Sequence, residues 1–182
     1  MVAFEISELY GAFAERASLA YGPAFSCLRG LWRGDHEVLG RATLRPEEAK
    51  QCGDFASIHP ILLDCCLQAV AGIGWRAAPA EAATEEAETG AGQMMLPVGA
   101  SIFRVYRDDA NECQDVWCRV VAVGGGGGGG GGRPTKVRTV NIFVYDAAYR
   151  CVDEKAPLIA EVLQLKLMPA DGQSLAGEGK TR

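Results

Sequence analysis

The chain has 182 residues, of which 48% are hydrophobic and 23% are charged, and its net charge is −5. This length suits one domain with an ordinary core, and the hydrophobic content excludes a wholly disordered chain. The sequence has no basic stripe and no apolar run long enough to span a bilayer, so it predicts neither a nucleic-acid partner nor a membrane segment.

The first predicted element is an amphipathic helix over residues 4–18, where apolar residues recur at helical spacing. A Tyr-Gly-Pro break follows at 21–23. Residues 37–44 alternate in the manner of a half-buried strand, and a polar loop is expected over 46–54.

The central element is a helix over residues 61–75. Pro60 suits its first turn, where the missing N–H has no helical partner to lose. The segment is apolar nearly all round, which indicates a buried helix. The Ala/Glu-rich residues 77–92 have no apolar anchors, and we expect a loop or mobile insertion there.

Four strand-like runs complete the domain: 96–107, 115–123, 137–145 and 158–168. The unbroken glycine run from Gly124 to Gly132 lacks the Lys, Ser or Thr of a phosphate-binding loop, and predicts a flexible hairpin insertion. The polar residues 170–182 are expected to be a disordered tail.

The order of the elements predicts the fold class. One strand, one buried helix and then consecutive strands do not form a β-α-β rhythm. The pattern predicts an α+β domain over residues 1–169, with a curved, mainly antiparallel sheet wrapped around a central helix. The hot-dog fold has this description.

The cysteines predict neither disulfides nor a metal centre. Their number is odd, no Cys-x-x-Cys pair occurs, and the two histidines fit no ligand quartet. Reduced, mostly buried thiols are expected. The N-terminus shows no secretory signal, so a cytoplasmic protein is predicted.

Asp64 is the residue that points to chemistry. Its apolar helix offers little to solvate a carboxylate, so its pKa should be raised and the protonated carboxyl is suited to act as a general acid. Gln68 lies one turn further on the same face and is placed to orient it. From composition alone, a solvent-facing Asp64 is an equal alternative.

Residues 59–68, His-Pro-Ile-Leu-Leu-Asp-Cys-Cys-Leu-Gln, resemble the His-Pro-x-Leu-Leu-Asp-x-x-x-Gln segment of polyketide synthase dehydratase domains. Residues 21–25, Tyr-Gly-Pro-Ala-Phe, resemble their Tyr-Gly-Pro-x-Phe motif, and residues 95–98 resemble a strand start in that family. The likeness runs from about residue 4 to 168. It identifies the chain with the C-terminal hot-dog half of such a dehydratase.

The resemblance implies a division of labour between two hot-dog halves. A histidine of the N-terminal half removes the α-proton of a β-hydroxyacyl thioester, and Asp64 protonates the leaving hydroxyl, oriented by Gln68. Residues implied to contact the substrate are Tyr21, Gly22, Pro23, Phe25 and His59. The resemblance implies a substrate carried on the phosphopantetheine arm of an acyl carrier protein. It implies no metal or dissociable cofactor.

One departure limits the resemblance. The His-x-x-x-Gly-x-x-x-x-Pro motif of the N-terminal half is absent, and neither His36 nor His59 replaces it. From its place just ahead of the helix, His59 is expected to cap or brace the helix start rather than to act in catalysis. A second hot-dog half or other synthase domains are therefore expected as partners.

Two classes of function remain open at this point. In the first, the chain is part of a dehydratase, or of a related isomerase or cyclase that uses the same pocket. In the second, it is a non-catalytic hot-dog module that binds acyl carrier protein or braces a synthase assembly. A homodimer in which His59 serves the partner's site is the least favoured alternative.

Overall fold

The computed structural model describes residues 1–55, 57–74, 94–123, 138–148 and 158–169. The predictions made for 77–92, for Gly124 to Gly132 and for 170–182 lie outside these residues.

Within the described residues the strands form one antiparallel eight-stranded sheet. Its order is β1-β2-β3-β6-β7-β8-β4, and β5 also pairs with β8. The strands are β1 (Val2–Ala3), β2 (Leu28–Arg33), β3 (Glu37–Thr43), β4 (Met95–Gly99), β5 (Ile102–Val105), β6 (Asp115–Val123), β7 (Arg138–Asp146) and β8 (Leu158–Pro169).

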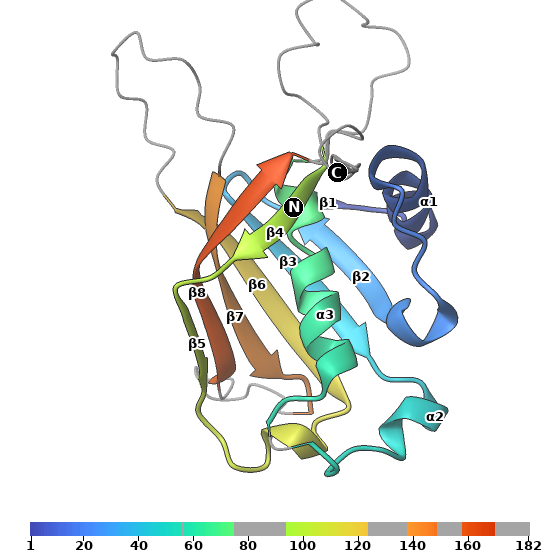
Figure 1. Cartoon of the computed structure of the whole chain (residues 1–182), viewed down its shortest axis with the longest axis vertical. Coiled ribbons are helices and arrows are strands. Elements are labelled where there is room, and N and C mark those ends of the chain that lie inside the picture. The colour runs from blue at the N-terminus through green and yellow to red at the C-terminus, as the bar shows by residue number, and fades with distance from the viewer. Residues whose placement is uncertain (56, 75–93, 124–137, 149–157, 170–182) are drawn as a thin grey trace, which may run out of the picture.

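The helices lie on one side of this sheet and beside it. They are α1 (Ile6–Ala17), α2 (Pro46–Ala49), α3 (Pro60–Gln68) and α4 (Ala71–Gly74), with single 3-10 turns η1 (Pro23–Phe25) and η3 (Ala110–Glu112). Figure 1 shows α3 lying along the face of the curved sheet, with α1 alongside it beyond β2. The predicted α+β arrangement, a curved antiparallel sheet around a central helix, is confirmed.

The core forms between α3 and the inward side chains of the middle strands. In the first six residues of β6 every second residue is inaccessible to solvent, namely Val116, Cys118 and Val120. This is the period of two that a strand with one buried face requires. Helix α3 contributes Leu62, which is also fully buried. Burial of each such side chain contributes roughly 1.5–3 kcal/mol to stability, so the interface fixes the helix against the sheet.

The sequence predicts one strand ahead of the central helix, whereas the structure has three. The longest of those missed is β2, which contains Gly30, a residue that usually weakens strands. In the structure the indole of Trp32 lies over this glycine, where a Cβ would overlap the ring. The same indole packs against Trp117, with ring centroids 5.6 Å apart. Gly30 therefore makes room for an aromatic pair instead of ending the strand.

The predicted helix over 61–75 is divided in the structure. It ends at Gln68 and resumes as α4 after Ala69 and Val70. Val70 N–H bonds to Leu67 O, and the next turn also has three-residue spacing, which tightens the chain and ends the regular helix. Ala69 and Val70, which link the two helices, are fully buried. The sequence is therefore apolar through the break and does not show where the helix ends.

The predicted strand over 96–107 is also divided. Its first part, β4, pairs with the second half of β8, and its second part, β5, pairs with the first half. Between these halves Gln164 has a left-handed φ of 52°, and its N–H bonds to Asn141 Oδ1 at 2.9 Å. This bulge in β8 bends the strand, so one straight partner cannot follow it.

Two smaller results concern the predicted loop and the thiols. Residues 46–54 contain the four-residue helix α2, which begins at Pro46. The six cysteines that the structure describes are free thiols, five of them buried.

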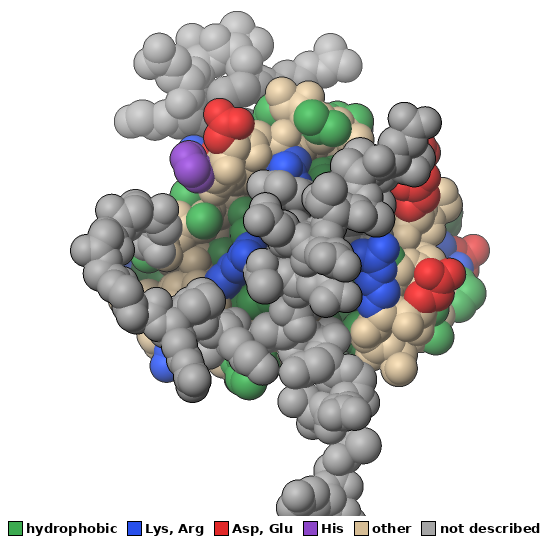
Figure 2. All heavy atoms as spheres, turned by 90° about the horizontal axis from the view of Figure 1, so that it is seen from above, with side chains coloured by type: hydrophobic (Ala, Val, Ile, Leu, Met, Phe, Trp, Pro, Cys, Tyr) green, Lys and Arg blue, Asp and Glu red, His purple; other side chains and the backbone are tan. Residues whose placement is uncertain are grey.

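The surface shows charges of both signs. On the face seen in Figure 2, acidic and basic side chains are interspersed, and the described residues in view form no continuous basic stripe. None of the described helices combines the length and apolar character that crossing a membrane requires.

Candidate active site

Helix α3 places Asp64 and Gln68 one turn apart on one face. Gln68 Nε2 donates a hydrogen bond of 2.7 Å to Asp64 Oδ2. The contact expected from the spacing is therefore present, while the chemical role of the pair stays a prediction.

The side-chain amide of Gln68 is held from three directions. The residue is only 3% exposed. Besides Asp64, Nε2 reaches the carbonyl oxygen of Phe25 at 3.0 Å, and Oε1 accepts from the Tyr10 hydroxyl at 2.9 Å. The same hydroxyl accepts from Leu28 N–H at 3.3 Å. Helix α1, the η1 turn, β2 and α3 thus meet at one amide.

Tyr10 is the site residue that sequence analysis missed. It follows Leu9 at the margin of the buried face of α1 and is partly buried itself. A hydroxyl-bearing ring at the edge of an apolar stripe often needs a buried partner, and that is the only signal the sequence offers. Its partner, 58 residues away, is not marked by any spacing rule.

Burial raises the pKa of Asp64, and the hydrogen bond from Gln68 lowers it in part. More of its carboxyl is therefore protonated near neutral pH than in an exposed aspartate. Burial also raises the pKa of Tyr21 to about 12, and the nearby Asp64 contributes in the same direction. Tyr21 is consequently a neutral hydrogen-bond donor at physiological pH.

Asp64 opens into a small hollow of about 50 Å³. Its walls come from α1, the segment after it, α3 and β4: Phe13, Tyr21, Asp64, Leu67, Gln68, Met95, Leu96 and Pro97. The carboxyl, the amide and the phenol hydroxyl are the polar side-chain groups among these residues, so polar chemistry here is confined to one place.

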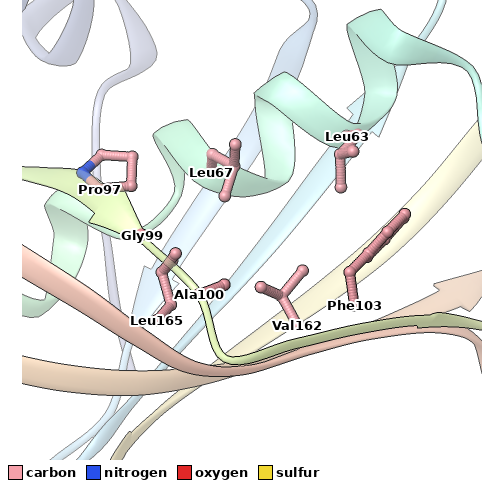
Figure 3. A pocket seen from close by; sticks show the side chains of 8 residues that line it. All are labelled: Leu63, Leu67, Pro97, Gly99, Ala100, Phe103, Val162 and Leu165. Atoms are coloured by element: carbon pink, nitrogen blue, oxygen red, sulfur yellow. The ribbon is translucent and has the colours of Figure 1, made fainter.

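An apolar groove of about 290 Å³ adjoins this hollow. Figure 3 shows leucines of α3 facing side chains of β8 and the β4–β5 segment across it. The lining residues are Leu63, Leu67, Pro97, Gly99, Ala100, Phe103, Val162 and Leu165. Leu67 and Pro97 belong to both spaces. A carboxyl of raised pKa thus lies at the edge of a surface suited to a hydrocarbon chain.

The residues of the Tyr-Gly-Pro-Ala-Phe segment differ in whether they line the site. Tyr21 lines the hollow, and its ring packs edge-on against Phe13 with centroids 5.1 Å apart. Gly22, Pro23 and Phe25 line neither the hollow nor the groove. The Phe25 side chain is 41% exposed, and it is the carbonyl that contacts the amide of Gln68. A substrate contact by these three residues stays a prediction.

His59 caps α3, as its position ahead of the helix predicts. Nδ1 accepts a hydrogen bond of 3.2 Å from Ile61 N–H, and the ring packs edge-on against Phe55 at 4.8 Å. The residue is 1% exposed and lines neither space. Burial lowers its pKa, which Glu48 partly offsets, so a neutral imidazole that accepts at Nδ1 is favoured.

The raised pKa of Asp64 predicts a stability penalty for its carboxylate. The folded state holds this proton more tightly than the unfolded chain does, so the stabilisation is present below the ordinary pKa of 3.8 and is lost as the pH rises through the raised pKa. Asp64→Asn is therefore expected to melt at a higher temperature than the parent chain at neutral pH, and at the same temperature in acid. Thermal unfolding over a pH series measures this difference.

The control for this experiment is Asp35→Asn, because Asp35 is exposed between β2 and β3. Its melting temperature should follow that of the parent chain at every pH. A gap for Asp64→Asn that does not change with pH would contradict the interpretation, since the gap would then not arise from the proton.

Comparison with known proteins gives a consistent family. A family model described as the polyketide synthase dehydratase N-terminal domain matches residues 2–129. Among curated proteins, the pikromycin polyketide synthase component PikAII of Streptomyces venezuelae is 36% identical over 102 residues, which is 56% of this chain and 3% of that protein. Polyketide synthase GfsB of Streptomyces halstedii is 43% identical over 63 residues, 35% of this chain and 1% of that protein.

Solved structures of dehydratase domains superimpose over most of the chain. An inactive CurK dehydratase mutant, in which phenylalanine replaces a histidine, has a TM-score of 0.65 at 25% identity and covers 96% of this chain. The dehydratase domain from the CurF module of curacin polyketide synthase has a TM-score of 0.64 at 26% identity and covers 92%. The chain spans 50% and 48% of these two structures, and a few per cent of the curated synthases.

Proposed function

Because this chain belongs to the polyketide synthase dehydratase family, we propose that it supplies the acid half of a dehydratase site. The substrate is a β-hydroxyacyl thioester carried on the phosphopantetheine arm of an acyl carrier protein. The observation that carries the proposal is the Asp64–Gln68 pair, whose carboxyl lies beside an apolar groove and has its pKa raised by burial.

We assign the chain to the C-terminal half of the dehydratase, although the matching family model is described as the N-terminal domain. Two sequence features support this assignment. Residues 59–68 carry the aspartate motif, and the sequence lacks the His-x-x-x-Gly-x-x-x-x-Pro motif. The base then comes from a second hot-dog half, in keeping with solved relatives about twice as long as this chain and with the inactivity of the CurK histidine mutant.

The proposed reaction is an elimination of water. The partner's base takes the α-proton, the electron pair of that C–H bond forms the α,β double bond, and the bond between the β-carbon and the hydroxyl oxygen breaks. Asp64 gives its proton to this oxygen, which leaves as water, so the carboxyl ends the step ionised. Because Oδ2 accepts from Gln68, the transferred proton sits on Oδ1.

An acid and a base with separated pKa values suffice for this elimination, so the proposal requires no metal or dissociable cofactor. The apolar groove receives the acyl chain, and Tyr21 contacts the substrate near the carboxyl. Other synthase domains are the partners of this half.

The test is reconstitution. The chain is mixed with a β-hydroxyacyl carrier protein, alone and together with a separately produced N-terminal dehydratase half, and loss of water is followed by mass spectrometry. We expect no turnover by the chain alone and turnover when the second half is present.

Turnover by the chain alone would place a base inside this sequence and contradict the division of labour. Carrier-protein binding without turnover in any combination would favour the non-catalytic module. Movement of a double bond without loss of water would instead indicate an isomerase that uses the same pocket.

A further inference from the structure

The hydroxyl of Tyr10 connects the N-terminal helix to the site. It accepts from the backbone N–H of Leu28 at 3.3 Å and donates to Gln68 Oε1 at 2.9 Å. The hydroxyl also lies 3.5 Å from the carbonyl oxygen of Phe25, at the long limit of a hydrogen bond, so the shorter contact to Gln68 Oε1 is the favoured direction for the phenol proton. Tyr10 thus presents a donor, anchored to β2, to one end of the Gln68 amide.

The other end of that amide faces two acceptors. Nε2 lies 3.0 Å from the Phe25 carbonyl oxygen and 2.7 Å from Asp64 Oδ2. If the amide were reversed, its oxygen would face the Phe25 carbonyl oxygen, which has no proton to donate, and its NH2 group would face the Tyr10 hydroxyl. The orientation with Nε2 toward Asp64 therefore satisfies every partner, and Tyr10 satisfies the remaining atom, Oε1.

Removing the phenol hydroxyl would leave Oε1 without this donor in a residue that is 3% exposed. A buried acceptor that loses its partner is unfavourable enough to drive rearrangement. The amide is then no longer held in this orientation, and the hydrogen bond to Asp64 weakens.

We propose that Tyr10 is a positioning residue, which acts through Gln68 to hold the Asp64 carboxyl in one orientation. The hydrogen bonds connect three elements: they run from the backbone of β2 to Tyr10 of α1, and from there to Gln68 and Asp64 of α3. Its catalytic meaning rests on the proposed dehydratase function, but the coupling itself does not.

The surroundings of Asp64 allow this coupling to be measured cleanly. The titratable groups that act on or respond to its charge are Tyr21, Cys65 and Cys66. All three have raised pKa values, because of burial and, for the cysteines, thiol neighbours, so they stay neutral while Asp64 titrates. Burial likewise raises the pKa of Tyr10 well above its ordinary range, which keeps it a donor throughout.

The experiment is an NMR titration of the Asp64 side-chain carboxyl carbon in the full chain. In Tyr10→Phe the pKa of Asp64 is expected to rise by about one pH unit, the size expected when one hydrogen bond to a carboxylate is lost. The matched control is Tyr145→Phe, which removes a phenol hydroxyl from a partly buried position on β7. That control should leave the pKa of Asp64 unchanged.

A double variant tests the route. In a Gln68→Leu background, adding Tyr10→Phe should change the pKa of Asp64 no further, because the link is already broken. An equal rise in both backgrounds, or no rise in either, would overturn the proposal.

If Tyr10→Phe does not fold, the parent chain still provides a test. The Tyr10 hydroxyl proton is then expected as a slowly exchanging resonance, and its absence would overturn the proposal. No substrate enters either measurement. A chain that dehydrates nothing can therefore still show the coupling, and an active dehydratase can lack it, so the two proposals fail separately.

Discussion

Asp64→Asn is expected to lower dehydration in the reconstituted enzyme by about 10²–10⁴-fold, the contribution usual for a general acid. Asparagine has nearly the same shape, and its carbonyl oxygen can still accept from Gln68 Nε2. Asparagine has no acidic proton for the leaving hydroxyl, so the rate of the chemical step should fall while substrate binding is retained. Measuring kcat and KM separately tests this: kcat should fall while KM changes little.

The pairing with a matched variant makes this result decisive. Asp35→Asn makes the same chemical change at an exposed position between β2 and β3 and should retain the parent rate. If Asp64→Asn also retained that rate while folded, Asp64 would not be the acid. The proposal for this half of the site would then fall.

Gly40→Ala is expected to lower the free energy of unfolding by roughly 1–3 kcal/mol, the usual range for overpacking a core. Gly40 lies in β3 where the chain following α3 crosses the sheet. A Cβ there would lie 2.7 Å from Cys118 Sγ and 3.1 Å from the Cβ of Ala69. The glycine therefore permits the close approach of the chain after α3 to the sheet. Urea unfolding measures the change.

Two further variants isolate the cause. Gly11→Ala adds the same methyl group in α1, where nothing lies within 4 Å, and should stabilise the chain by about 0.5–1 kcal/mol. Cys118→Ala removes the nearest atom, so the double variant Gly40→Ala/Cys118→Ala should recover part of the loss. An unfolding midpoint for Gly40→Ala equal to that of the parent would mean that helix and sheet are further apart than described.

Much of the fold follows from local patterns in the sequence. The alternation in β3, the Val, Ile, Phe and Tyr content of β6 and β7, and the apolar periodicity of α1 predict elements close to those observed. The errors have tertiary causes: Gly30 in β2 makes space for an indole, and the bulge at Gln164 divides the partners of β8. Neither a ring packed over a glycine nor a bulge on another strand leaves a signal in the segment that it affects.

The site divides in the same way. Asp64 and Gln68 could be predicted because they are four residues apart on one helix, and a helix fixes that geometry. The hydrogen bond from Tyr10 to Gln68 could not be predicted, because the two residues are 58 positions apart and meet only when α1 packs near α3. The capping role of His59 lies between these cases, since a cap is local to the helix that it begins.

The pairing of β3 with β6 has a consequence for the order of folding. Thr43 and Asp115, partners across these strands, are separated by 72 residues, and α3 lies inside the loop that they close. Closing such a loop spends chain entropy before the contacts form, so non-local pairing of this kind slows folding. Helix α3, which contacts both strands, is therefore expected to gain its full packing against the sheet only when this loop has closed.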